Sequence, residues 1–127
     1  MPPKQPRRYL KLQTSTTGAP FSDAVQVDKT LYIAGQIGVD PQTGEIPSDL
    51  QKEIEFLFDR IESILREAKM SLTNITLLQV SCSDAALYEV FNAVYSRRFG
   101  TEYPARSFIV AGLVKNARFH ASAIAVE

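Results

Sequence analysis

The chain has 127 residues, 45% of them hydrophobic, and its 14 basic residues balance its 14 acidic residues. This length suits one domain with one core, and the composition is typical of a globular protein rather than a disordered one. The balanced charge argues against a general nucleic-acid-binding surface, and we expect neither a membrane-spanning segment nor a signal peptide.

The N-terminal segment, residues 1–18, is expected to form a tail and a first extended segment of one domain that covers residues 1–127. It is rich in proline, and its basic residues gather in one cluster. These residues are Lys4, Arg7, Arg8 and Lys11. A charged cluster in a proline-rich terminus is typical of a solvated tail, and the alternative is a nucleic-acid-binding arm.

The first two strands are predicted ahead of a loop. Residues 24–27 and 30–34 have strand character, and the turn residues Asp28 and Lys29 between them indicate a hairpin. The stretch DPQTGE, residues 40–45, contains proline and glycine and is therefore predicted to be a loop.

Two helices are predicted in the middle of the chain. The first covers about residues 49–69, because Ser48 and Gln51 match a capping box and apolar residues follow at helical spacings. These apolar residues are Leu50, Ile54, Leu57, Ile61, Ile64 and Ala68. The second helix is expected to be capped by Asp84 and to end at Gly100. Its apolar residues are Leu87, Val90, Phe91, Val94 and Phe99.

Three further strands are predicted over residues 75–82, 106–110 and 118–126. The resulting order ββαβαββ indicates an α+β sandwich in which the helices pack on one face of a sheet. The last strand carries apolar residues on both faces. One face has Phe119, Ala121, Ala123 and Ala125, and the other has Arg118, His120, Ser122, Ile124 and Val126. If the helices cover only one face, packing of sheets in a homo-oligomer would cover the other.

The stretch EYPARSFIVAGL, residues 102–113, places a permanent cation at the start of a strand. Pro104 restricts the backbone just before Arg106 and so sets the direction in which the chain enters the strand. Arg106 has two interpretations. It forms a surface ion pair at a strand end, or its planar fork of donors binds a carboxylate or phosphate.

The chain has one cysteine, Cys82, and one histidine, His120. This excludes an internal disulfide framework and a Cys/His zinc site within one chain, and it is compatible with a reducing cytoplasm. Cys82 is expected to be a buried or interface thiol rather than a nucleophile. His120 is either a partly buried histidine between Arg118 and Ser122 or a general base, since its ordinary pKa lies near neutrality.

Three motifs stand in order along the chain: AGQIGVDPQTGEIPSD (34–49), FNAVYSRRFG (91–100), and YPARSFIVAGL (103–113) with the closing AIAV. Over residues 19–126 the sequence thereby resembles the Rid family of reactive-intermediate deaminases, also called YjgF-type proteins. The resemblance implies a chorismate-mutase-like fold with a mixed sheet and a homotrimer with ligand clefts between neighbouring subunits. It also implies hydrolysis of 2-imino acids or their enamine tautomers to 2-keto acids and ammonia, without a metal or organic cofactor.

The resemblance assigns roles to three residues that match the family pattern or lie within it. Arg106 matches the family arginine that holds the substrate carboxylate. Gly35 matches a glycine of the cleft wall, where the missing side chain lets the ligand approach the backbone. Phe108 stands where relatives often have cysteine, and its backbone N–H is expected to contact the ligand.

Other positions depart from the family pattern. Phe21 replaces a tyrosine that supplies a hydroxyl, and Ala34 replaces a serine or threonine. His120 falls on the glutamate that is thought to place the attacking water, if one residue is deleted from the preceding loop. We expect Phe21 and Ala34 to line the substrate site and His120 to act in catalysis together with the arginine. Asn92 and Tyr95 match family residues and are expected to satisfy backbone groups near the cleft.

Three functions are compatible with these observations, and imine or enamine deamination is favoured. The alternative is a non-catalytic trimer that binds small carboxylates as a metabolic sensor, because Phe21, Ala34 and His120 have lost the family's usual polar groups. An endoribonuclease or translation inhibitor, as some members have been described, is disfavoured by the balanced charge. The expected partners are a 2-imino or 2-keto acid and further copies of the chain, without a membrane.

Overall fold

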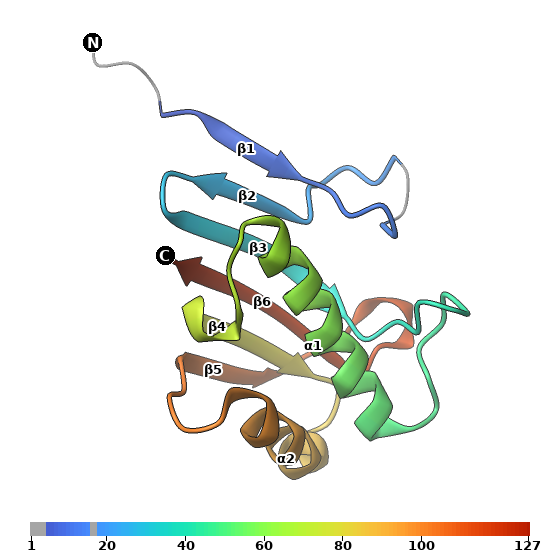
Figure 1. Ribbon diagram of the computed structural model, residues 1–127. Coiled ribbons are helices and arrows are strands. Elements are labelled where there is room, and N and C mark those ends of the chain that lie inside the picture. Colours follow the sequence, from blue (N-terminus) through green and yellow to red (C-terminus); the bar gives the residue numbers. More distant parts are fainter. Residues whose placement is uncertain (1–4, 16–17) are drawn as a thin grey trace.

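The computed structural model describes residues 5–15 and 18–127 of the chain. Within them the chain forms a mixed sheet and two α-helices, joined by short connections (Figure 1). The elements are β1 (Arg7–Leu10), β2 (Ala24–Val27), β3 (Thr30–Ile37), α1 (Leu50–Glu67), β4 (Ile75–Cys82), α2 (Tyr88–Phe99), β5 (Ala105–Val110) and β6 (Phe119–Val126). Single 3-10 turns lie at Leu72–Asn74, Ala85–Leu87 and Val114–Asn116.

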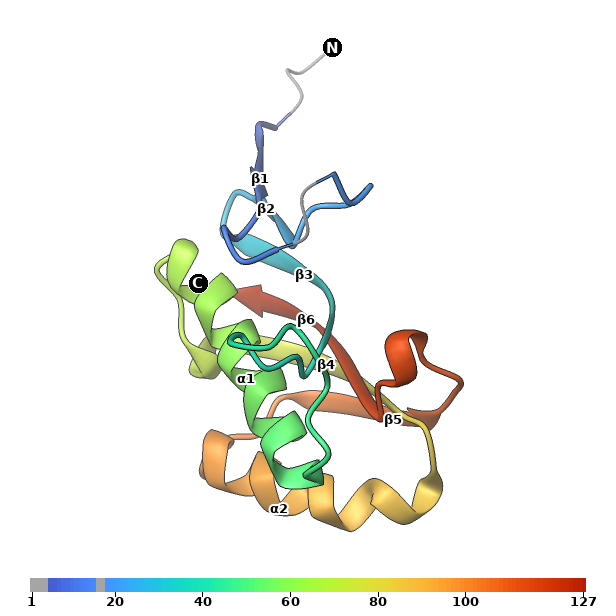
Figure 2. The same ribbon diagram turned by 90° about the vertical axis from the view of Figure 1, so that its right-hand side faces the viewer.

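The six strands of the sheet lie in the order β1-β2-β3-β6-β4-β5. Only β4 and β5 pair in parallel, and the other neighbouring strands are antiparallel. Both helices pack on the same face of this sheet, with α1 across its centre and α2 near the β5 end (Figures 1 and 2). The predicted α+β class, with two helices on one face of a mixed sheet, is confirmed. In the described part of the chain, no helix is both long enough and apolar enough to span a membrane.

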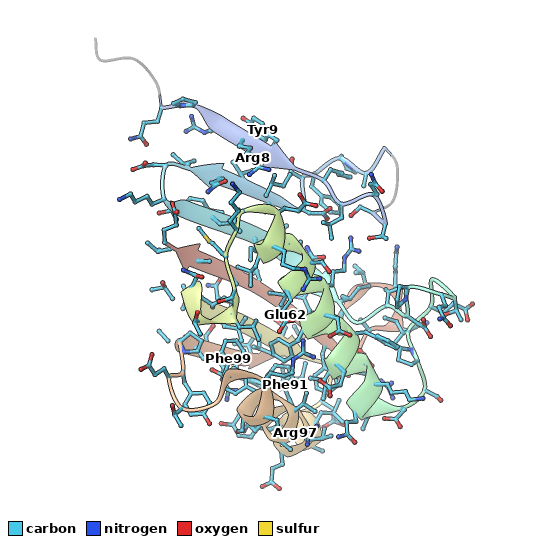
Figure 3. The ribbon with its side chains drawn as sticks, in the orientation of Figure 1. Arg8, Tyr9, Glu62, Phe91, Arg97 and Phe99 are labelled. Carbon is cyan, nitrogen blue, oxygen red and sulfur yellow. The ribbon has the colours of Figure 1, made fainter. Side chains whose placement is uncertain are left out.

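The strand β1 lies within residues 1–18, where the sequence predicts a tail and an extended segment but no paired strand. It pairs antiparallel with β2, from Arg7 opposite Val27 to Leu10 opposite Ala24, so the observed order is βββαβαββ. Figure 3 shows Arg8 on this outer strand. The interpretation of Arg7 and Arg8 as part of a solvated tail is therefore wrong in its backbone structure, although both side chains are exposed. Lys4, from the same predicted cluster, lies outside the described residues.

Helix α1 forms where the apolar periodicity predicts it, and its apolar stripe is buried against the sheet. Its N-cap is Asp49, whose carboxylate accepts hydrogen bonds from the backbone N–H of Gln51 at 2.8 Å and of Lys52 at 3.2 Å. The predicted capping box of Ser48 and Gln51 is therefore wrong by one position. Asp49 forms the cap because its side chain satisfies two of the N–H groups that lack partners in the first turn.

Helix α2 begins after a 3-10 turn and joins the core through aromatic contacts. Asp84 caps that turn, and Gly100 ends the helix with a φ of 75°, as the sequence predicts. The ring of Phe91 lies 5.7 Å from that of Phe58 in α1 and 5.6 Å from that of Phe119 in β6. Phe91 and Phe99 are labelled on α2 in Figure 3. These contacts fix α2 against both α1 and the sheet.

The two helices cover one face of the sheet and leave the other face uncovered among the described residues of this chain. We call the face under the helices the helix face and the opposite one the open face. Along β6, the residues on the helix face are buried and those on the open face are only partly covered, as the alternation predicts. The open face also carries Tyr32, which is 49% exposed. A homo-oligomer that covers this face remains a prediction.

Candidate ligand-binding site

Arg106 lies on the helix face of β5, beside the buried Leu78 of β4, and points toward α2. Its Nη1 donates a hydrogen bond to the side-chain oxygen of Asn92 at 2.7 Å, and its Nη2 lies 3.4 Å from the hydroxyl of Tyr88. No carboxylate in the described residues lies within ion-pair distance of it. The interpretation as a surface ion pair therefore has no support among residues 5–15 and 18–127.

Four aromatic rings surround the Arg106 guanidinium. Its central carbon lies 4.7 Å from the ring centroid of Tyr95, 5.2 Å from that of Phe108, and 5.6 and 5.9 Å from those of Tyr88 and Phe91. Ring faces attract a cation, and a planar guanidinium stacks well on them. Burial raises the pKa of Tyr95, which keeps its hydroxyl protonated, although the nearby cation of Arg106 acts in the opposite direction. The arrangement fixes the cation without neutralising it.

Helix α2 supplies this support from one side. Tyr88, Asn92 and Tyr95 follow one another at spacings of four and three, so they share one face of the helix. The structure corrects the predicted roles of Asn92 and Tyr95, because their side chains hold the guanidinium rather than satisfy backbone groups. Tyr88 was not predicted at all. Its helical spacing from Asn92 and Tyr95 is the signal that could have identified it.

A shallow hollow of about 510 Å³ adjoins the rings around Arg106. Its lining residues are Ala85, Ala86, Tyr88, Glu89, Phe108 and Val110. Tyr88 and Phe108 belong both to this hollow and to the surroundings of the guanidinium, and their rings lie 4.9 Å apart. The hollow therefore places an open, largely apolar surface next to a fixed cation.

His120 lies on the open face and covers Gly35. The pairing of β3 with β6 is interrupted by a bulge between Ile33 and Gln36, and His120 pairs with Ile37 just beyond it. A Cβ atom added at Gly35 would lie 2.0 Å from Nε2 of His120, so a larger residue at this position would displace the imidazole ring. The space that we assigned to an approaching ligand is therefore filled by imidazole within this chain.

Burial lowers the pKa of His120 below its ordinary value of 6.5, because the charged form loses hydration. A lowered pKa means that the imidazole is neutral at pH 7. A neutral imidazole can accept a proton from water, whereas the charged form cannot. The environment of His120 is therefore compatible with the role of a general base.

Ala34 lies within the bulge, and Phe21 lies in the loop between β1 and β2. The backbone N–H of Ala34 donates to the carbonyl oxygen of Asp23 at 2.9 Å, which joins the bulge to the end of the loop between β1 and β2. Phe21 belongs to this loop and is 58% exposed. The ammonium of Lys11 lies 5.0 Å from its ring centroid and donates to its carbonyl oxygen at 2.8 Å.

The structure brings the predicted site residues together in two groups rather than one. Arg106 and Phe108 share the helix face of β5, while Gly35 and His120 lie together on the open face of β3 and β6. Since the groups lie on opposite faces of one sheet, a single chain does not join them in one pocket. Their meeting in a cleft between two copies of the chain remains a prediction.

Cys82 is free and fully buried, and its thiol donates to the carbonyl oxygen of Asp84 at 3.2 Å. The prediction of a buried thiol is therefore confirmed. In the part of the chain that the structure describes, no cluster of three or more histidine, cysteine, aspartate or glutamate side chains is arranged to hold a metal ion.

Comparisons with known proteins agree with the fold and with the motifs. The family model described as Endoribonuclease L-PSP matches residues 12–127. The 2-iminobutanoate/2-iminopropanoate deaminase of Bos taurus is 37% identical over 110 residues, which cover 85% of this chain and 80% of that protein. A RutC family protein of Leuconostoc mesenteroides is 38% identical over 128 residues, which cover 92% of this chain and 98% of that protein.

Solved structures are similar over almost the whole chain. RidA from an Antarctic Psychrobacter species superposes with a TM-score of 0.88 at 30% identity, covering 94% of this chain and 99% of that one. Yeast Mmf1 superposes with a TM-score of 0.89 at 28% identity, covering 96% and 99% of the two chains. Because the family model, the curated relatives and the solved structures all match over most of its length, the chain belongs to the Endoribonuclease L-PSP family, which includes the Rid and RutC proteins.

Proposed function

We propose that this protein hydrolyses 2-imino acids, or their enamine tautomers, to 2-keto acids and ammonia. Water oxygen bonds to the imine carbon and gives up one proton, while the C=N π electrons move to the nitrogen, which gains a proton. In the resulting carbinolamine the hydroxyl proton is transferred to the amino nitrogen, the C–N bond breaks with the release of ammonia, and the keto acid remains. An imine carbon is already electrophilic, so the protein needs mainly to orient the carboxylate, the imine and the water. The proposal includes no metal or organic cofactor.

The fixed guanidinium of Arg106 carries this proposal. Its central carbon lies 4.7 Å from the Tyr95 ring, and Nη1 is bonded to Asn92, so the side chain is held in one orientation before a ligand arrives. No carboxylate of the described chain neutralises it. A pre-oriented arginine suits bidentate binding of a substrate carboxylate. Relatives at 34 to 37% identity that are named 2-iminobutanoate/2-iminopropanoate deaminase support the same reaction.

We further propose that the site lies between two subunits of a homotrimer. Arg106 and Phe108 of one copy would face Gly35, Ala34 and His120 of the next. This arrangement is supported by the separation of the two groups on opposite faces of the sheet. It is also supported by the apolar side chains on the open face, which a second sheet would cover.

The assembly can be measured directly. We expect sedimentation equilibrium at micromolar concentration to give three times the mass of the 14.1 kDa chain, because the open face of the sheet needs a partner. A stable monomer under these conditions would contradict both the trimer and the shared cleft.

His120 is proposed to accept the proton of the attacking water. Because burial lowers the pKa of His120, the imidazole is neutral at pH 7, so the rate should be constant at neutral and higher pH and should fall at acid pH as the imidazole becomes charged. The His120→Ala variant should be slower and should lose this dependence. The measurement is the initial rate of keto-acid formation between pH 5 and 8, taken at intervals of about half a pH unit. A variant rate equal to the wild-type rate at every pH would exclude the role.

The alternatives give different results in the same kind of assay. A 2-imino acid formed in situ by an amino-acid dehydratase hydrolyses slowly in water, and the proposed enzyme should accelerate the release of keto acid and ammonia. A non-catalytic carboxylate binder would bind 2-oxobutanoate in calorimetry without accelerating this release. An endoribonuclease would cleave RNA instead, but the balanced charge of the chain does not favour binding a polyanion. A cytoplasmic location is part of the proposal, since the single cysteine is free.

A further inference from the structure

Arg60 on α1 connects parts of the chain that are far apart in sequence. Its Nε donates to the side-chain oxygen of Gln36 in β3 at 2.7 Å. Its Nη1 donates to the hydroxyl of Thr14 at 3.1 Å, and its Nη2 to that of Ser15 at 2.5 Å. Both hydroxyls belong to the segment between β1 and β2. One half-buried guanidinium thus fastens a strand and a loop to the helix.

The hydrogen bond from Arg60 to Gln36 connects the helix to the bulge beneath His120. Gln36 is 4% exposed, and its amide nitrogen donates to the carbonyl oxygen of Ala34 at 3.0 Å. This bond spans Gly35 and closes the bulge on itself. The Gln36 side chain therefore links the two residues that flank Gly35, and the ring of His120 lies against Gly35.

The hydrogen bonds from Arg60 to Thr14 and Ser15 connect the helix to the loop that contains Phe21. Asp23 is 2% exposed and accepts a hydrogen bond from the hydroxyl of Ser15. Its second carboxylate oxygen lies 3.6 Å from Nη2 of Arg60. The carbonyl oxygen of Asp23 accepts from the N–H of Ala34, so the loop and the bulge meet again in the backbone. Arg60 thus binds the buried amide of Gln36 directly. It reaches the buried carboxylate of Asp23 through Ser15 and as an ion pair.

We propose that Arg60 is a positioning residue that holds the Phe21 loop and the Gly35–His120 bulge in one fixed arrangement. It touches neither the proposed substrate nor the reacting atoms, and it acts through Gln36 and Ser15. Its planar group is suited to this task because its donors point in separate, fixed directions, which a lysine ammonium cannot reproduce. The kinetic consequence rests on the proposed deaminase function, whereas the structural consequence does not.

The kinetic test compares Arg60→Met and Arg60→Lys with the wild type. A small misplacement of a catalytic group can lower a rate by up to about 100-fold, and we expect Arg60→Met to lower kcat by about tenfold. The dissociation constant of 2-oxobutanoate should change by less than about threefold, because the carboxylate would bind to Arg106 on the other face of the sheet. Arg60→Lys should restore only part of kcat. Arg66→Met is the matched control, since Arg66 lies on the same helix but is 67% exposed.

The structural test does not depend on activity. His120 is the only histidine, so its imidazole signals in NMR spectra are unambiguous. In Arg60→Met the signals of His120 and the Gly35 amide should shift, in Arg60→Lys they should shift less, and in Arg66→Met they should stay unchanged. If Arg60→Met does not fold, the shifts of the His120 and Gly35 signals in Arg60→Lys are compared with those in Arg66→Met, and this comparison decides the role of Arg60.

The two hypotheses fail separately in these tests. A wild type that does not accelerate imine hydrolysis would exclude the proposed function and leave the NMR comparison to decide the role of Arg60. Unchanged His120 and Gly35 signals in a folded Arg60 variant would overturn the positioning role, even in an active enzyme. Equal shifts in Arg66→Met would overturn it as well, because they would reflect a general property of the helix.

Discussion

Replacing Arg106 with alanine is expected to weaken binding of a 2-keto acid by about 10- to 100-fold. The proposed contact is a charge-assisted pair between guanidinium and carboxylate, and losing such a pair costs about 1.5 to 3 kcal/mol. The wild-type side chain is already oriented by Asn92 and by the surrounding rings, so little further ordering opposes binding. The measurement is calorimetric titration with 2-oxobutanoate, followed for each variant by a thermal melt.

Two further variants separate the role of charge from that of geometry. Arg106→Lys keeps the charge but not the planar fork, so it should recover only part of the affinity. Arg97→Ala is the matched control, because Arg97 is a 54% exposed arginine whose partner Glu55 lies 3.9 Å away. Affinity in Arg106→Ala equal to that in Arg97→Ala would show that Arg106 serves the fold rather than the ligand.

Local signals in the sequence were sufficient for most of the fold. The apolar spacing in α1 and the glycine that ends α2 depend on neighbouring residues, and both are predicted correctly. The strand β1 could not be predicted in the same way. It has four residues, RRYL, of which only Leu10 is buried, and it becomes a strand because β2 offers an unpaired edge. That information lies in the tertiary structure and not in the segment itself.

The sequence identified Arg106 and His120 as candidates, but it did not predict what surrounds them. The motif around Arg106 identified a cation that the structure holds in place, yet the sequence did not reveal the rings around it. The bulge between Ile33 and Gln36 changes which side chains meet across β3 and β6, and it brings His120 over Gly35. Strand alternation alone cannot predict such a shift, because one extra residue alters the register.

The role of Glu53 was also not predicted from the sequence. Its side chain is fully buried near the start of β6. One oxygen accepts hydrogen bonds from the backbone N–H groups of Arg118 and Phe119, at 2.8 and 3.1 Å. The other accepts from Nε of Arg118 at 2.7 Å. The guanidinium of Arg118 also donates to the carbonyl oxygens of Ser48 and Pro47. We call this group the Glu53 clamp, and it extends to Phe119, the residue directly before His120.

Replacing Glu53 with alanine is expected to lower the free energy of unfolding by about 3 to 5 kcal/mol, which is typical for removing one partner of a buried pair. The loss would be large because the buried N–H of Phe119 and Nε of Arg118 would both lose their acceptor. Glu53→Gln keeps the shape of the side chain and should lose less, since its amide oxygen can still accept. The measurement is urea denaturation followed by circular dichroism at one fixed protomer concentration, because assembly adds to apparent stability.

Glu62→Gln provides the matched control for the Glu53 clamp. Glu62 lies on the same helix, is 32% exposed and pairs with Arg98 at 3.1 Å, so its loss should cost less than about 1 kcal/mol. A loss in Glu53→Ala no greater than in Glu62→Gln would show that the clamp contributes no more than a surface pair. If the clamp holds the start of β6, the NMR signals of His120 should also shift in folded Glu53→Gln and stay unchanged in Glu62→Gln, because only Glu53 binds the backbone next to that strand.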